Sequence, residues 1–289
     1  MSIFQKTSLL LWIYSIFLSL IFFKNCNGLE EDERNNNLRS HTSGQRPVMH
    51  TYYMKKLEHL ENEWDTEEHL DMLHMWKNSW EAAGWETRVL TDEDAKKHPK
   101  FDEFEAMLKK LKISTYNHYC FHRWLAMAVI GGGWMSDYDV VPLSMTAEWE
   151  KNNRPEFDKF QSYGSAVPCL LYGSSEEWDR MANSIMQYVP EHEGGHFSDM
   201  KGLIRYVREH PYSINRHDTV GTRFLVLPDG RSIDCSSYRG NIAWHFSHFA
   251  SHVALEEGII KEPKPPPKSR AWYMRRFMRD FKLQCFVDQ

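Results

Sequence analysis

Two carboxylates separated by one residue, Asp137 and Asp139, are the side chains in this sequence best suited to chemistry. They follow three glycines, Gly131 to Gly133, and precede Val140-Val141-Pro142. Residues two apart in an extended backbone point to the same side, so both acids would face one site. Paired carboxylates suit Mg²⁺ or Mn²⁺, ions that leave positions for water and phosphate oxygens. A solvated turn is the alternative, but the apolar neighbours favour a bound cation because they deprive the acids of hydration.

An arginine precedes this acidic pair on a strongly apolar segment. Residues 116–130 are apolar on nearly all sides, which predicts a deeply buried helix. Arg123 lies on one face of it, between Cys120 and Met127. A buried guanidinium needs anions or carbonyl oxygens as partners. A structural ion pair is one interpretation. Donation to sugar hydroxyls or phosphate oxygens is the other, and the glycines and acids that follow favour it.

The elements that must position these residues alternate between strands and helices. Residues 47–53 and 85–90 are short runs typical of strands, whereas residues 66–83, 101–113 and 116–130 have helical spacing. This order predicts an α/β domain in which helices flank a central, mostly parallel sheet.

The segment from Arg123 to Asp139 resembles the core of family 32 glycosyltransferases, the sugar-binding region that contains the DXD motif. The matching residues are, in order, Arg123, Gly131 to Gly133, Trp134, Asp137 and Asp139. The resemblance implies a Rossmann-like GT-A fold, a nucleotide-sugar donor, Mn²⁺ or Mg²⁺ on the two acids, and an arginine that holds the donor sugar. Cys120 stands where the family usually has Asp, and one extra residue separates the arginine from the first acid.

The same resemblance implies donor contacts by residues before the acids. Tyr53 ends the first predicted strand, three residues after His50, where the family's strand end packs near the nucleotide base. An ordinary strand aromatic is the alternative. Gly132 and Gly133 are expected beside the donor, together with Arg123 and Asp137.

Two later segments supply further candidates through the resemblance. In glycosyltransferases of this general fold, a C-terminal loop often returns a histidine to the metal. His245 and His248 could share one face of a helix, and a neutral imidazole suits Mn²⁺ better than Mg²⁺. Core or surface histidines are the alternative. Asp199, at the start of a predicted helix, is a catalytic candidate that reaches the donor sugar or acceptor, although it or Ser198 could equally be an N-cap.

The composition is that of a globular protein. The chain has 289 residues, 42% of them hydrophobic, and a formal net charge of -5, which does not suggest a nucleic-acid partner. Cys120, Cys169, Cys235 and Cys285 would face an oxidising lumen, where one or two disulfides of open connectivity are expected.

We divide the chain into four parts. Residues 1–28 are interpreted as a signal peptide or signal-anchor, because an apolar run lies between lysines, and residues 29–46 as a polar stem. Residues 47–260 form the expected glycosyltransferase domain, in which residues 148–160 are expected to be a loop over the site. Residues 261–289 are a Pro/Lys-rich linker and a basic amphipathic tail that could lie on a membrane or partner, or pack back on the domain.

Taken together, these features predict a metal-dependent, retaining glycosyltransferase of the hexosyltransferase type. It would move a sugar from a nucleotide-sugar to a glycan, protein or lipid acceptor in the Golgi or ER lumen, as a type II membrane protein or, after leader cleavage, a secreted one. A haloacid dehalogenase-type phosphatase is one alternative, because residues 137–141 fit its Asp-x-Asp-x-Val loop. A non-catalytic lumenal sugar-binding protein of the same fold is another.

Overall fold

A computed structural model describes residues 46–54, 66–156, 158–222, 235–247 and 270–285. The expected leader, most of the expected stem and the predicted ligand His248 lie outside the described residues.

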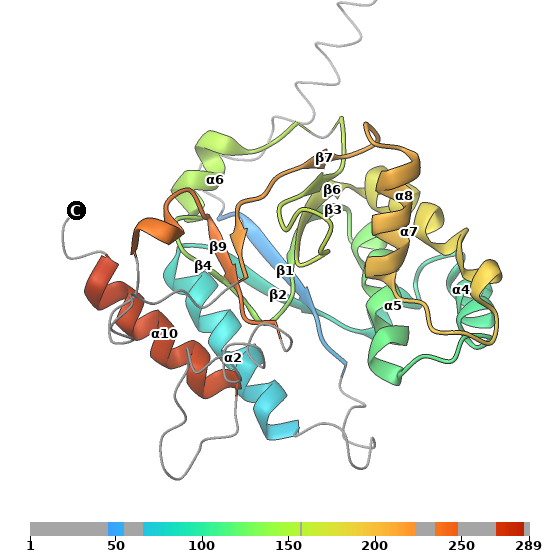
Figure 1. The fold of residues 1–289 in the computed structure, drawn as a ribbon, viewed down its shortest axis with the longest axis horizontal. Coiled ribbons are helices and arrows are strands. Elements are labelled where there is room, and N and C mark those ends of the chain that lie inside the picture. Colours follow the sequence, from blue (N-terminus) through green and yellow to red (C-terminus); the bar gives the residue numbers. More distant parts are fainter. Residues whose placement is uncertain (1–45, 55–65, 157, 223–234, 248–269, 286–289) are drawn as a thin grey trace, which may run out of the picture. The chain divides into compact units, whose positions relative to one another are not determined.

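A six-stranded mixed sheet is the centre of the fold (Figure 1). Strand β1 is parallel to β2 and β3, β6 is antiparallel to β3 and β5, and β7 is parallel to β5. In spatial order the strands are β2 (Glu86–Leu90), β1 (Val48–Tyr52), β3 (Gly132–Ser136), β6 (Leu170–Ser174), β5 (Gln161–Ser162) and β7 (Asn215–Arg216). The predicted α/β class with a mostly parallel central sheet flanked by helices is confirmed.

A second, three-stranded sheet continues from the end of β3. Its order is β4 (Val140–Pro142), β9 (Ala243–His245) and β8 (Val220–Gly221). Strand β9 is antiparallel to β4 and parallel to β8, so a segment about a hundred residues downstream lies directly beside the residues after the acidic pair.

Helices cover both faces of the central sheet (Figure 1). One group packs with Met135 and Leu171 on the sheet: α4 (Phe101–Leu108), α5 (Thr115–Val129), α7 (Ser175–Met186) and α8 (Asp199–Glu209). Trp134 and Leu170, one residue earlier on the same strands, point to the opposite face, as strand alternation requires. The remaining helical elements are α2 (Thr66–Ala82), α3 (Asp92–Ala95), α6 (Ala147–Asn153), η2 (Val189–His192), η3 (Cys235–Tyr238) and α10 (Arg270–Cys285).

Helix α5 places Arg123 in the interior. Ser114 caps its first turn by accepting a hydrogen bond from the Asn117 backbone N–H, and residues 121–128 are all buried. The helix ends at three consecutive glycines with positive φ, of which Gly132 has φ +75°. A Cβ atom at Gly132 would lie 2.6 Å from the carbonyl oxygen of Gly173, so this position needs glycine for close packing against β6.

The basic C-terminal tail packs back on the domain. Helix α10 buries Met274, Phe277 and Phe281 against α2 and β9, in a cluster that includes Met72 and Trp244. A disulfide between Cys235 and Cys285 joins its last residue to η3. This is one of the two arrangements that the sequence left open.

Three local expectations were wrong. The helix expected over residues 101–113 ends at Leu108. The loop expected over residues 148–160 begins as helix α6, where Glu150 is buried and accepts a hydrogen bond from the indole of Trp134. The helical spacing of residues 66–83 predicts that Leu70, Leu73, Trp76 and Trp80 share one apolar face, but in α2 Leu70 is 40% exposed, whereas Trp76 and Trp80 are fully buried.

Candidate functional site

The acidic pair lies in a turn between β3 and β4. The backbone N–H of Val140 donates to the carbonyl of Asp137 at 3.0 Å, which closes the turn. The expectation that an extended backbone aligns Asp137 and Asp139 was therefore wrong, since β3 ends at Ser136. The turn still brings the two carboxylates together, because their oxygens and a nitrogen of His245 all lie within 4.8 Å of one another.

Strand pairing brings His245 to this turn. Val140 is directly opposite His245 in the β4–β9 ladder, and the backbone N–H of Phe246 donates to the carbonyl of Asp139 at 2.8 Å. The imidazole Nε2 is 3.3 Å from Asp139 Oδ1. His245 is the last residue of β9, so it does not lie on the helix through which His245 and His248 could have shared a face.

Arg123 joins the acidic turn to helix α8. Its Nη1 donates to Asp137 Oδ1 at 2.5 Å, and its Nε donates to Asp199 Oδ2 at 3.1 Å. Nη2 also donates to Asp199, and so does the indole N–H of Trp124 at 3.1 Å. Arg123 is only 6% exposed, so the guanidinium depends on these carboxylates for its stability in the interior.

Asp199 supports the arginine and does not face the cleft. It is 3% exposed and is the first residue of α8, where Ser198 is the N-cap. Its Oδ1 accepts a hydrogen bond from the Met200 backbone N–H at 2.7 Å, and the helix N-terminus further stabilises the negative charge. In the structure the Asp199 carboxylate bonds to Arg123, and its contact with a donor sugar or acceptor stays a prediction.

The sequence analysis missed a second arginine, Arg270. This first residue of α10 donates from Nη1 to Asp139 Oδ2 at 3.0 Å and to the carbonyl of Phe246 at 3.2 Å. The expected basic tail therefore supplies a side chain to the candidate site. Only the packing of α10 on the domain distinguishes Arg270 from the other cations of the tail.

The charges around the turn offset one another. Burial raises the pKa of the Asp137 carboxyl, and Arg123 opposes this effect only in part. Burial also acts to raise the pKa of Asp139, but His245 and Arg270 outweigh it and hold that pKa below its ordinary value. Burial lowers the pKa of His245, yet the adjacent Asp139 carboxylate raises it well above 6.5 overall. Without a metal, therefore, His245 is the positively charged partner of Asp139.

A tyrosine-rich cleft opens beside the two acids. The space within it, counted together with the open solvent at its mouth, is about 580 Å³. Arg123, Asp137 and Asp139 lie in its wall, and the other lining residues are Tyr52, Tyr53, Met54, Tyr116, Tyr119, Cys120, Met135 and Tyr138. Aromatic faces of this kind are suited to stacking on a planar base.

Tyr53 lies where the sequence analysis expects a base-contacting side chain. It lines the cleft, and Tyr138 packs against it edge-on with the ring centroids 5.8 Å apart. His50, three residues earlier, does not line the cleft; its Nδ1–H donates to the carbonyl of Trp134 at 2.9 Å and so links β1 to β3. Burial lowers the pKa of His50 to about 4, and the imidazole is therefore neutral near pH 7.

Gly132 and Gly133 do not line the cleft. They begin β3, and Asp137 follows the other end of that strand. Their contact with a bound donor stays a prediction. The close approach of Gly132 to β6 is a structural reason for glycine at this position, because a Cβ atom there would lie 2.6 Å from the carbonyl oxygen of Gly173.

The turn has the donor atoms that Mn²⁺ requires. Two carboxylates and an imidazole match the ligand preferences of this ion better than those of Mg²⁺. Each arginine engages one oxygen of its acid, Arg123 on Asp137 and Arg270 on Asp139. Asp139 Oδ1 is buried and, among the described residues, accepts no hydrogen bond, although His245 Nε2 lies 3.3 Å from it. A divalent ion between this oxygen and a neutral imidazole would take the place of their ion pair.

The fold and the cleft define an α/β protein with an acidic, arginine-braced pocket at the end of strand β3. The chain belongs to the family described as a domain of unknown function, DUF8765, whose profile matches residues 32–219. No curated protein sequence matches the chain. Among solved structures, a glycosyltransferase involved in the glycosylation of the major capsid of PBCV-1 aligns with a TM-score of 0.44 and 9% identity, over 79% of this chain and 98% of that one.

Proposed function

We propose that this protein is a metal-dependent, retaining glycosyltransferase of the hexosyltransferase type that uses a nucleotide-sugar donor. The observation that carries the proposal is the convergence of Asp137, Asp139 and His245 at a tyrosine-lined cleft, with Arg123 in the same wall. Metal ligands, a fixed cation and aromatic faces are the groups that a sugar diphosphate nucleotide requires.

Different residues at the cleft would bind the metal ion, the diphosphate or sugar, and the base. Asp137, Asp139 and His245 would hold Mn²⁺, or less favourably Mg²⁺, and the bound ion would neutralise charge on the leaving diphosphate. Arg123 would donate to diphosphate or sugar oxygens with N–H groups that now bond to Asp137, while Asp199 keeps it in place. Tyr53 would stack on the base.

Retention of configuration is the part of the proposal that the resemblance to family 32 glycosyltransferases implies. Within the described part of the cleft, the carboxylates of Asp137 and Asp139 each accept from an arginine, so neither is a free nucleophile for a covalent sugar–enzyme intermediate. For retention without such an intermediate, the acceptor hydroxyl would attack the anomeric carbon on the face from which the diphosphate leaves. Its oxygen forms the new bond as the sugar–diphosphate bond breaks, and its proton passes to the departing diphosphate oxygen.

An oxidising compartment is part of the proposal. The Cys235–Cys285 disulfide supports residence in the secretory pathway, because thiols stay reduced in the cytosol. We propose the Golgi or ER lumen, with the N-terminal segment as a type II anchor or a cleaved leader and a glycan, protein or lipid as acceptor. Within the described ranges, which begin at residue 46, no helix is long and apolar enough to cross a membrane.

No observation favours the phosphatase alternative. Its nucleophilic aspartate would end the first strand of the domain, whereas Asp137 follows β3, the third strand along the chain. Arg123 also donates to Asp137 Oδ1, which reduces the nucleophilicity of that carboxylate. The non-catalytic sugar-binding alternative keeps the same cleft, so only an assay of turnover separates it from the enzyme.

The test is a thermal-shift screen of nucleotide-sugars with and without Mn²⁺, followed by an assay of donor hydrolysis and transfer. A donor should raise the melting temperature more with Mn²⁺ than without it, because a ligand of the native state stabilises it by RT ln(1 + [L]/Kd). Asp139→Asn should remove the Mn²⁺-dependent part of the shift and lower turnover by about a hundredfold, since the ion supplies several kcal/mol of charge stabilisation.

The matched control is Asp102→Asn, which makes the same change at an exposed acid on α4. It should behave as the wild type. An unchanged donor response in Asp139→Asn would disprove the metal-bridged site. Donor binding without hydrolysis or transfer would instead identify a sugar-binding protein.

A further inference from the structure

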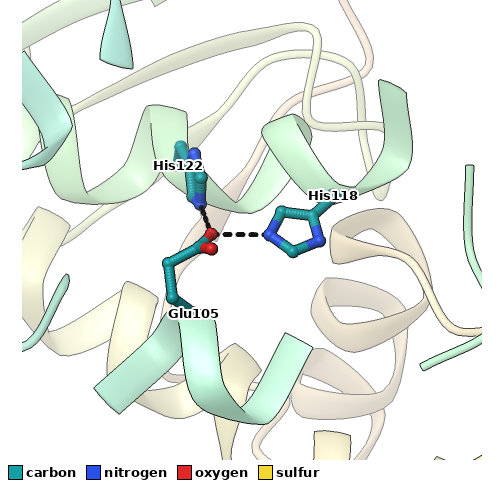
Figure 2. Close-up of side chains that lie close together, drawn as sticks. All are labelled: Glu105, His118 and His122. Carbon is teal, nitrogen blue, oxygen red and sulfur yellow. Dashed lines mark hydrogen bonds and ion pairs between the residues drawn. The ribbon is translucent and has the colours of Figure 1, made fainter. Parts of the chain in front are cut away.

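A second group of metal-ligand side chains lies outside the cleft. Glu105 on α4 and two histidines on α5, His118 and His122, point at one another (Figure 2). Both imidazoles use Nε2, and each Nε2 is 2.6 Å from the same carboxylate oxygen, Glu105 Oε1. Three donor atoms from two neighbouring helices therefore converge on a single point.

The helices fix this arrangement. His118 and His122 are four residues apart, so they lie on the same face of α5 one turn from each other. His122 is buried, whereas the side chains of Glu105 and His118 are each 19% exposed. The group is thus held by the core on one side and open to solvent on the other, and an ion has a route of entry.

A carboxylate lies behind the buried histidine. His122 Nδ1 is 3.5 Å from Asp92 Oδ1, and within the described residues it makes no hydrogen bond. Asp92 also accepts a hydrogen bond from the hydroxyl of Tyr52, a residue of the cleft wall. A carboxylate beside one ring nitrogen favours the orientation in which the other nitrogen faces an ion, and here 3.5 Å separates Asp92 Oδ1 from His122 Nδ1.

We propose that Glu105, His118 and His122 bind a zinc-class divalent transition metal through one carboxylate oxygen and two Nε2 atoms, with water as the fourth ligand. Two imidazoles and one carboxylate with an open position are a donor set that Zn²⁺ accepts. Bonds of about 2.0–2.1 Å in a tetrahedral site keep donors roughly 3.3 Å apart, so each of the two 2.6 Å separations between Glu105 Oε1 and an imidazole Nε2 must grow by less than about 1 Å.

Little opposes that movement. The other oxygen of Glu105, Oε2, is 3.7 Å from the ammonium group of Lys109, whose side chain is 71% exposed. In the described part of the chain, no arginine pairs with Glu105. The bound ion would join α4 to α5, and through His122 and Asp92 it would reach Tyr52 in the wall of the cleft.

Zinc counting on purified, chelator-treated protein tests the proposal. Asp139→Asn serves as the starting protein, so that the cleft acids do not contribute a second ion. After dialysis against Zn²⁺, this protein should hold one zinc per chain, and Asp139→Asn/His118→Gln should bind zinc at least tenfold more weakly. His74→Gln in the same background is the matched control, because His74 is an exposed histidine on another helix, α2. This control should keep its zinc.

Two further measurements separate loss of the metal site from loss of folding. Circular dichroism without metal checks that the variants fold, and Glu105→Gln, which keeps the side-chain volume, repeats the test if His118→Gln does not fold. Co²⁺ added to the starting protein should give the intense visible absorption of a four-coordinate ion, and this absorption should be lost in both variants. Absence of zinc from the starting protein, or full zinc binding in the two ligand variants, would overturn the proposal and leave the group as a carboxylate shared by two imidazoles.

Discussion

The two clusters of acids and histidines in this protein are built in different ways. The cleft cluster takes Asp137 and Asp139 from the turn after β3 and His245 from β9, and two arginines already engage its acids. The α4–α5 cluster takes its ligands from adjacent helices: two imidazoles share one oxygen of Glu105, and the other oxygen is 3.7 Å from the exposed ammonium group of Lys109. The first cluster depends on long-range strand pairing and on charge compensation, whereas the second depends on helix periodicity and on one helix–helix contact.

This difference suggests different tasks for the two clusters. In the cleft, Arg123 and Arg270 can exchange their hydrogen bonds to Asp137 and Asp139 for hydrogen bonds to an incoming anion. The α4–α5 cluster has no arginine in the described part of the chain, so it can exchange only a metal ion or a proton. Substitutions of Arg123 or Arg270 should therefore affect the cleft cluster and leave the α4–α5 cluster unchanged.

The largest expected effect follows from removal of the buried arginine, Arg123. Arg123→Met leaves Asp199, which is 3% exposed, without its charged partner, so the free energy of unfolding should fall by about 3–5 kcal/mol. Urea denaturation measures this loss. Arg205→Met is the matched control, because Arg205 pairs with Glu191 and Glu209 at the surface, where such pairs contribute below about 1 kcal/mol. Equal losses of unfolding free energy in the two variants would contradict the stabilising role of Arg123.

A somewhat smaller effect is expected where α10 is attached. Cys285→Ser opens the disulfide that closes a 50-residue separation, which should cost about 2–4 kcal/mol of stability. Because α10 carries Arg270, Mn²⁺-dependent donor binding in the cleft should also change. Zinc binding by the α4–α5 cluster should stay the same. A loss at both clusters would show that the variant acts through general unfolding and would remove the contrast between them.

His50, which belongs to neither cluster, makes the free energy of unfolding depend on pH. Its pKa is lowered to about 4 by burial, so the folded state resists protonation that the unfolded state accepts near 6.5. The stabilising effect of the neutral ring is complete above pH 6.5 and is lost as the pH falls toward 4, by roughly 3 kcal/mol in total. His50→Asn should flatten this part of the stability profile, as measured by thermal denaturation at a series of pH values. A profile with the wild-type slope would show that other groups cause the acid sensitivity.

Local patterns in the sequence predicted the strands, helices and acids that lie close together in the chain. The apolar face of α5 identified Arg123 as a buried cation in need of anions, and the structure supplies Asp137 and Asp199. The acids were recognised although the backbone around them is a turn, because their apolar flanks were sufficient evidence of an unusual environment.

The remaining contacts depend on long-range packing that no local pattern encodes. Arg270 was one cation among several in a basic tail, and only the burial of Phe277 and Phe281 against the domain brings it to Asp139. Gly132, which suggested a ligand contact, lies too close to β6 for a Cβ atom, and all three glycines have positive φ. The spacing of His118 and His122 is visible in the sequence, but their third partner comes from another helix.

Anomalous scattering at the manganese edge, from crystals soaked in Mn²⁺, tests the central claim most directly. The account predicts a peak bonded to oxygens of Asp137 and Asp139 and to a nitrogen of His245, in the wall of the tyrosine-lined cleft. Crystals of Asp139→Asn should lack this peak. If wild-type crystals show no manganese there, and Arg123 and Arg270 keep both carboxylates in ion pairs at saturating metal, the account is contradicted.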